Sequence, residues 1–213
     1  MSLMTENIVF KPFQFPWAIE IAEQHEDIHW TEKEINLAED VTQWKNGELL
    51  DIEKEHIISI LRLFTSADVI VAQNYCDFYI PKFPNNEIRS MLLSFSAREG
   101  IHQRAYALLN DTLGLHEKEY STFLEYKEMV NKTDFMRDAD VTTHQGLAKS
   151  IALSVFNEGV TLFSAFAMLL NYQRRGKMKG MGTVIEWSIR DETLHVEGMS
   201  KLFREFCREH SRV

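Results

Sequence analysis

Residues 95–106 read Phe-Ser-Ala-Arg-Glu-Gly-Ile-His-Gln-Arg-Ala-Tyr, and residues 188–195 read Ser-Ile-Arg-Asp-Glu-Thr-Leu-His. Both stretches contain Glu-x-x-His, which on a helix places a carboxylate and an imidazole on one face, close enough to approach the same ion. Apolar residues share that face at helical spacing: Ile88, Leu92, Phe95 and Tyr106 around Glu99 and His102, and Ile185, Ile189, Val196, Met199 and Phe203 around Glu192 and His195. Both pairs are therefore predicted to face a core, where a carboxylate needs a compensating charge.

The sequence contains two further Glu-x-x-His pairs, Glu26/His29 and Glu53/His56. With this number of glutamates and histidines, about one such pair is expected by chance. The surrounding sequence therefore has to show which pairs face the core. Both of these pairs lie in strongly polar stretches near predicted helix ends, and we assign them to the solvated surface. His56 also precedes Asp68 on one predicted helix by about 18 Å of axial rise, which is too far for both to reach one metal cluster.

Composition favours a helical protein. The 213 residues are 45% hydrophobic, with nine glycines and no proline after Pro84. This argues against an all-β sandwich and for a single domain over residues 1–213, with residues 1–3 set aside as a leader added for expression. Apolar periodicity predicts a loop over 131–140 and helices over 17–26, 52–80, 87–110, 117–130, 142–172 and 181–209. The longest of these have the scale of a large four-helix bundle.

The net charge and the cysteine content limit which binding partners and which cellular compartment we expect. The formal charge of −9 and the lack of a basic stripe with interleaved aromatics argue against nucleic acid as a direct partner. The uncharged stretch 159–173 is interrupted by polar residues, and we interpret it as a core helix rather than a membrane span. Cys76 and Cys207 match no disulfide framework, and no signal peptide is recognisable, so we expect free thiols in a reducing cytoplasm.

Two single carboxylates extend the pattern of core-facing acids. Asp68 shares an apolar stripe with Ile57, Leu61, Phe64, Val71 and Tyr75, and Glu158 shares one with Ile151, Val155, Leu162, Ala165, Phe166 and Leu169. Each alone is compatible with an arginine partner or a local cap. Together, Asp68, Glu99, Glu158 and Glu192 carry four negative charges on four predicted helices, with no equal buried positive charge in the sequence pattern.

Two divalent cations balance that charge, and His102 and His195 can ligate them as neutral imidazoles. One carboxylate from each of two helices and Glu-x-x-His from each of two others is the ligand pattern of ferritin-like di-iron and di-manganese bundles. We therefore predict an all-α, ferritin-like helical bundle with a dimetal-carboxylate site in its core. Carboxylates with imidazole suit iron or manganese, whereas zinc sites are usually tetrahedral.

Tyr106 lies one helical turn beyond His102 on the same face. Aromatic residues at helical spacing are commonly core residues, so position alone leaves a packing role open.

The motifs resemble, as a set, the radical-generating small subunit of class I ribonucleotide reductase. The resemblance is carried by residues 95–106 and 188–195, by Asn157-Glu158-Gly159, by Leu63-Phe64-Thr65-Ser66-Ala67-Asp68 and by Ile28-His29-Trp30-Thr31-Glu32-Lys33-Glu34. It covers about residues 10–205, and the ordered set of six ligands with a tyrosine is specific.

The resemblance implies roles for these residues. Asp68, Glu99 and His102 would hold one metal ion, and Glu158, Glu192 and His195 the other. The ions would be iron, manganese or a mixed pair, activated by dioxygen. Tyr106 would carry the radical, behind an apolar shield that includes Leu162 and Phe166.

A radical-transfer relay is implied as well, in which Asp191 bridges His102 to the indole of Trp30. The alternatives are that Asp191 is a surface acid paired with Arg190 and that Trp30 is a hydrophobic staple at a helix entrance. Trp44 and Trp187 have no counterpart in the resemblance.

The resemblance further implies a homodimer that works with a large subunit in ribonucleoside diphosphate reduction, which supplies deoxyribonucleotides. The family's C-terminal helices and docking tail have no counterpart after residue 195, so a shortened chain is expected.

Two other functions stay open: another ferritin-like dimetal oxidase or hydroxylase, and a non-catalytic iron-storage or metal-binding bundle. Tyr106 and an aspartate at position 68 argue against the first, and a dimer would argue against a shell-forming storage protein.

Overall fold

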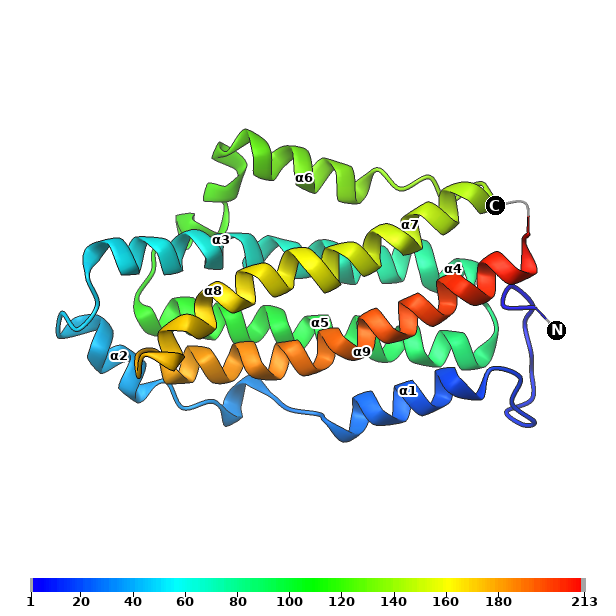
Figure 1. Cartoon of the computed structure of the whole chain (residues 1–213), viewed down its shortest axis with the longest axis horizontal. Coiled ribbons are helices and arrows are strands. Elements are labelled where there is room, and N and C mark those ends of the chain that lie inside the picture. Colours follow the sequence, from blue (N-terminus) through cyan, green and yellow to red (C-terminus); the bar gives the residue numbers. More distant parts are fainter. Residues whose placement is uncertain (1, 212–213) are drawn as a thin grey trace.

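The computed structural model describes residues 2–211, and the side chains of all of these except residues 65 and 66. Within this range the chain is helical and forms no strand. Helices run along the long axis of an elongated bundle, with the two described ends of the chain close together at one end (Figure 1). The predicted helical class is confirmed.

The bundle is built from nine α-helices, two π-helical segments and three short 3-10 turns within the described range. In chain order they are α1 Pro16–Asp27, η1 Glu32–Glu34, α2 Ala38–Lys45, α3 Asp51–Asn74, η2 Tyr75–Tyr79, α4 Ile80–Lys82, α5 Asn86–Leu113, η3 Glu117–Tyr120, η4 Thr122–Glu125, α6 Lys127–Arg137, α7 His144–Phe156, η5 Asn157–Leu162, α8 Phe163–Arg174 and α9 Lys179–Glu209.

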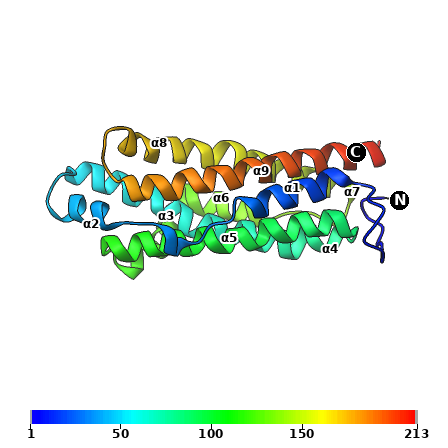
Figure 2. The ribbon, with the colours of Figure 1, turned by 90° about the horizontal axis from the view of Figure 1, so that it is seen from below.

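Four long helical rods form the centre of the fold: α3 with η2, α5, α7 with η5 and α8, and α9 (Figure 2). α1 packs against α5 and α9, and α6 packs against α3. Two clusters of buried apolar side chains fill the interior, one toward the α2 end around Phe64, Phe166 and Ile185, the other toward the opposite end around Phe83, Phe95 and Phe206. The candidate ligands stand in the middle of the rods.

The boundaries of the long helices follow from local signals. The side chain of Asn85 accepts hydrogen bonds from the N–H groups of Glu87 and Ile88 at the start of α5, and Gly114 ends that helix in the left-handed conformation (φ 73°). Gly198 allows α9 to approach α5, because a Cβ there would stand 2.8 Å from Cζ of Phe95.

The predicted loop over 131–140 is wrong, because α6 occupies Lys127–Arg137. The predicted helix over 117–130 is correspondingly broken into two 3-10 turns before α6 begins. α6 is polar on average and none of its residues is fully buried, so its sequence is similar to that of a loop. Packing against α3 and a hydrogen bond from Asn74 Nδ2 to the carbonyl of Met136 (3.2 Å) hold it in place.

α2, which the sequence pattern did not predict, brings a buried acid to the start of α9. Asp40 is fully buried, and its carboxylate accepts hydrogen bonds from the N–H of Gly180 (2.9 Å) and of Met181 (2.7 Å). Burial raises the pKa of Asp40, and the two backbone donors oppose that rise. A carboxylate at this position satisfies two donors of the first turn of α9 and complements its dipole.

We expect Asp40→Ala to lower the free energy of unfolding by about 1–3 kcal/mol, because two buried N–H groups lose their acceptor. Urea unfolding followed by circular dichroism measures the change. Glu39→Ala, at the exposed neighbouring position, is the control. Equal stabilities of the two variants would contradict the capping role.

The N-terminal residues contribute to the fold. Leu3 is fully buried in the cluster around Phe83 and Phe206, and its N–H donates to Oε1 of Glu209 (3.0 Å). Whatever their origin, residues 2 and 3 therefore belong to the packing of this chain, while residue 1 lies outside the described range.

The helix His144–Arg174 is the one described helix that is long and apolar enough to cross a membrane by length and composition. Of its most apolar window, 28% is buried inside the bundle, and Phe156, Val160 and Met168 lie on the outer face. A single helix of this kind is weak evidence for a membrane span, because core helices pass the same criterion.

Candidate metal centre

The six side chains singled out in the sequence converge on one place. Each of the four rods contributes: α3, α5, η5 and α9. None of the six is more than 2% exposed. Single oxygen and nitrogen atoms of Asp68, Glu99 and His102 lie within 4.8 Å of one another, as do those of Glu99, Glu158, Glu192 and His195. These two groups share Glu99.

Both histidines turn Nδ1 toward the carboxylates. Nδ1 of His195 lies 3.1 Å from Glu99 Oε1, 3.2 Å from Glu158 Oε2 and 3.3 Å from Glu192 Oε2. Nδ1 of His102 lies 3.3 Å from Glu192 Oε1 and 3.5 Å from Glu99 Oε2. One nitrogen per ring is thus offered to a shared space, and the other points away from it.

Several of these buried oxygens have no hydrogen bond. They are Oδ2 of Asp68, both carboxylate oxygens of Glu99 and Oε2 of Glu192. Buried polar atoms are normally paired, so this concentration of orphaned acceptors is unusual. Among the described residues Arg98 is the one buried arginine or lysine, and it is occupied by Asp191. The donor set, carboxylate oxygens with two imidazole nitrogens, fits two divalent cations.

The electrostatics of the cluster show what compensates the carboxylates when no cation is present. Burial lowers the pKa of His102, but the neighbouring carboxylates of Asp191, Glu192 and Glu99 raise it well above the ordinary value. Burial likewise lowers the pKa of His195, but the charge of Glu192 raises it well above the ordinary value. Burial opposes the ionisation of Glu192, but the two histidines lower its pKa to about 2. Burial and the charge of Glu99 raise the pKa of Asp68 well above 3.8. Protons on the histidines thus compete with cations for the same space.

A π-helical segment sets the direction of Glu158. η5 interrupts an otherwise regular rod between α7 and α8, and Glu158 is its second residue. Such segments insert an extra residue into a turn and occur frequently at functional sites. The hydroxyl of Tyr75, in the other π-helical segment, donates to Glu158 Oε2 (3.1 Å), and the hydroxyl of Ser154 donates to Oε1.

Asp191 is the hub of a buried network behind His102. Its Oδ2 accepts from the indole N–H of Trp30 (2.8 Å) and lies 2.9 Å from Nε2 of His102. The structure therefore brings Trp30, Asp191 and His102 together. The ring of Trp30 also stacks on His102, with centroids 5.9 Å apart.

The alternative pairing of Asp191 with Arg190 is wrong, because its arginine partner is Arg98, which donates to Oδ1. Arg190 instead lies over the ring of Trp187. Arg98 also donates to the carbonyl of His25 (2.7 Å), so it ties α5 to α1 and α9 together. A buried arginine one residue before Glu99 was not expected from the sequence, because a single basic residue on a long helix carries no signal of its orientation.

Tyr106 is buried beside the cluster. Its hydroxyl donates to Oγ of Ser188 (3.2 Å), and its ring stacks on Phe64, with centroids 4.9 Å apart. Phe64 in turn contacts Phe166, and Leu162 belongs to the same apolar cluster. Burial and the charge of Asp68 raise the pKa of Tyr106, so the phenol keeps its proton in this apolar setting.

The two remaining Glu-x-x-His pairs lie apart from the cluster, as the sequence predicted. Glu26 and His29 are exposed. Glu53 pairs with Lys177 (2.8 Å), and His56 contacts the hydroxyl of Tyr172 (2.8 Å).

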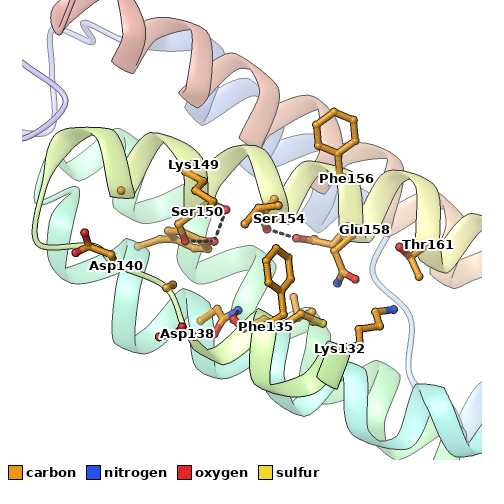
Figure 3. Close-up of a pocket in the computed structure, with 18 residues that line it drawn as sticks. Lys132, Phe135, Asp138, Asp140, Lys149, Ser150, Ser154, Phe156, Glu158 and Thr161 are labelled. Atoms are coloured by element: carbon orange, nitrogen blue, oxygen red, sulfur yellow. Dashed lines mark hydrogen bonds between the residues drawn. The ribbon is translucent and has the colours of Figure 1, made fainter. Parts of the chain in front are cut away.

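A cavity of about 550 Å³ opens between α6 and the α7–η5 rod and reaches the outer side of Glu158. Figure 3 shows Phe135 and Lys132 from α6 on one side and Ser150, Ser154 and Glu158 on the other. It connects one of the candidate ligands to a space large enough for small molecules and water.

Comparison with known proteins agrees with this geometry. The model of the family "Ribonucleotide reductase, small chain" matches residues 7–213. A probable ribonucleoside-diphosphate reductase small subunit, 376L, of Invertebrate iridescent virus 6 is 40% identical over 99% of this chain and 62% of its own length. Another, 048L, of Invertebrate iridescent virus 3 is 42% identical over 95% of this chain and 58% of its own length. The chain thus spans about three fifths of these relatives.

Solved structures share the fold. The ribonucleotide reductase R2 subunit from Clostridium botulinum superposes with a TM-score of 0.87, at 21% identity, over 99% of this chain and 69% of its own. The Streptococcus sanguinis dimanganese(II)-NrdF gives 0.83 at 18% identity, over 93% of this chain and 70% of its own. The fold is therefore the ferritin-like bundle predicted from the ligand pattern. Over nearly its whole length, this chain belongs to the ribonucleotide reductase small-chain family.

Proposed function

We propose that this chain is the radical-generating small subunit of a ribonucleoside-diphosphate reductase. The observation that carries the proposal is the convergence of six buried ligand side chains, with orphaned carboxylate oxygens, next to the buried phenol of Tyr106. Asp68, Glu99 and His102 would hold one ion, and Glu158, Glu192 and His195 the other. When bound, iron with dioxygen, or manganese with a separate oxidant, would supply the oxidising equivalent.

The chain's own residues account for the rest of the proposal. Phe64, Phe166 and Leu162 exclude water from the ring of Tyr106. Ser188 accepts the phenolic hydrogen bond and so holds the ring in place. Asp191 accepts from Trp30 while facing His102, which makes a continuous buried connection for electron transfer between the centre and Trp30.

We extend the proposal to the binding partners of the protein and to its cellular compartment. A large subunit would use the radical to reduce ribonucleoside diphosphates. A homodimer is supported by the likeness to the structure titled ribonucleotide reductase Rnr4 homodimer from Saccharomyces cerevisiae (TM-score 0.82, 19% identity, 95% of this chain and 66% of that one). Free thiols at Cys76 and Cys207 fit a reducing cytoplasm.

Anaerobic loading with Fe(II), and separately with Mn(II), tests the proposal. We expect two ions bound per chain and, after air is admitted to the iron form, a tyrosyl signal in the electron paramagnetic resonance spectrum. The manganese form is examined after addition of an oxidant. Binding of fewer than two ions would overturn the dimetal centre. Two bound ions without a tyrosyl signal under either condition would instead favour an oxidase or a metal-binding bundle.

A further inference from the structure

His25 lies on α1, outside the six candidate ligands, yet its ring reaches the cluster. The side chain is fully buried, and Nε2 lies 3.2 Å from Nε2 of His195. His195 turns its other nitrogen, Nδ1, toward Glu99, Glu158 and Glu192. The two imidazoles therefore meet through the nitrogen of His195 that faces away from the carboxylates.

Chemistry fixes the direction of this hydrogen bond once a cation is bound. A neutral histidine that ligates through Nδ1 keeps its proton on Nε2. Nε2–H of His195 then donates to Nε2 of His25, which must carry its own proton on Nδ1. Nδ1 of His25 lies 2.8 Å from Oγ of Ser94, which can accept it. With one tautomer of each ring, both hydrogen bonds can form, from His195 to His25 and from His25 to Ser94.

The Nε2 atoms of the two candidate ligand histidines consequently face different hydrogen-bond acceptors. Nε2 of His102 faces the carboxylate of Asp191 (2.9 Å). Nε2 of His195 faces a neutral imidazole, and the nearest acid to His25, Oδ1 of Asp191, is 3.8 Å from its Nε2 and already paired with Arg98. Partners of this kind orient a ligating histidine and tune its basicity.

We propose that His25 is a positioning residue of the metal centre: a hydrogen-bond acceptor that fixes the ring and tautomer of His195 so that Nδ1 faces the cation. This inference rests on the proposed dimetal centre. Its role differs from packing, although the ring of His25 also contacts Phe95, with centroids 5.2 Å apart.

Substitutions separate the two roles. His25→Phe keeps an aromatic ring against Phe95 but removes the acceptor. His25→Gln loses the ring but keeps an amide oxygen that can accept from His195. Ser94→Ala leaves both rings and removes only the acceptor for Nδ1–H of His25. His29→Phe, at an exposed position close by in sequence, is the matched control.

The experiment is anaerobic titration of the metal-free full chain with Co(II). Absorption spectra give the affinity of each ion, and proton nuclear magnetic resonance follows the strongly shifted, exchangeable N–H signals of cobalt-bound histidines. For the unmodified chain we expect two ions and two such signals. His25→Phe should weaken one of the two ions by about 10–100-fold and shift or broaden one N–H signal, leaving the other unchanged.

His25→Gln should restore most of the lost affinity, and Ser94→Ala should move the same N–H signal with a smaller loss. Unchanged affinities and N–H signals in folded His25→Phe would overturn the inference, and so would equal losses in the Phe and Gln variants. If His25→Phe does not fold, unchanged N–H signals in Ser94→Ala would overturn the inference instead. Failure of the unmodified chain to bind two ions would overturn the proposed centre, and this inference with it.

Discussion

Tyr106→Phe should abolish the tyrosyl signal of the air-oxidised, iron-loaded chain while two ions stay bound. The phenol is buried and stacked on Phe64, so water has no access to the ring, and its hydroxyl contacts Ser188 rather than a candidate ligand. Phenylalanine fills the same space without the oxidisable hydroxyl. Metal titration should therefore be unaffected, and the loss should be confined to the resonance spectrum.

Tyr75→Phe is the matched control, because Tyr75 is equally buried, lies in the other apolar cluster and donates directly to Glu158. We expect it to keep the signal. A signal that survives in Tyr106→Phe and disappears in Tyr75→Phe would move the radical to Tyr75. A signal that survives in both single variants would contradict both positions.

Asp68→Asn is expected to have opposite effects on stability with and without metal. In the metal-free chain, Asp68 is a buried carboxylate with an orphaned oxygen, beside Glu99. Asparagine removes that charge, so we expect the free energy of unfolding to rise by about 1–3 kcal/mol, the cost of an unsatisfied buried group. In the presence of Fe(II) or Mn(II), the loss of a ligand should weaken one ion by at least about 10–100-fold. The unmodified chain should then be the more stable, since bound ions add about 2.7 kcal/mol at a hundred times the dissociation constant.

The metal-free half of this prediction depends on pH in a defined direction. Burial raises the pKa of folded Asp68 well above its ordinary value of 3.8. The carboxyl of the unfolded chain therefore ionises at a lower pH than that of the folded chain, so the fold loses stability as the pH rises from 3.8 until the folded group also ionises. The advantage of asparagine should shrink as the pH is lowered from about 7 toward about 4. Urea unfolding at several pH values, with a chelator present, measures it.

Glu55→Gln removes an exposed acid from the same helix and is the control for Asp68→Asn. It should change stability little under either condition. If Asp68→Asn destabilises the metal-free chain, Asp68 is already compensated by a group within the protein, and the charge argument for the cations fails.

The long helices and the burial of Glu99, His102, Glu192 and His195 follow from local periodicity. An apolar stripe of period 3.6 decides which face of a helix is buried, and an acid on that stripe must go inside with it. Asp68 and Glu158 were found by the same rule, and all six are buried in the structure.

Other parts of the site have no local signal. α2 and α6 are short and polar on average, so the sequence pattern did not predict them, yet α2 supplies Asp40 to the start of α9. His25 shares the buried face of α1 with Ala18, Ile21 and Ala22, but this local pattern does not show that it is a neighbour of His195. Arg98 pairs with Asp191, 93 residues away along the chain.

The sequence by itself determined the fold class and the six ligand candidates, because helical spacing is a local property and acids on buried faces require a countercharge. It also indicated the family, through the resemblance of its motifs. Only the tertiary structure decided which atoms meet: that Arg98 holds Asp191, that Ser188 accepts from Tyr106, and that His25 stands behind His195. Those contacts join different helices, and their geometry depends on how the helices pack and on the π-helical turn that carries Glu158.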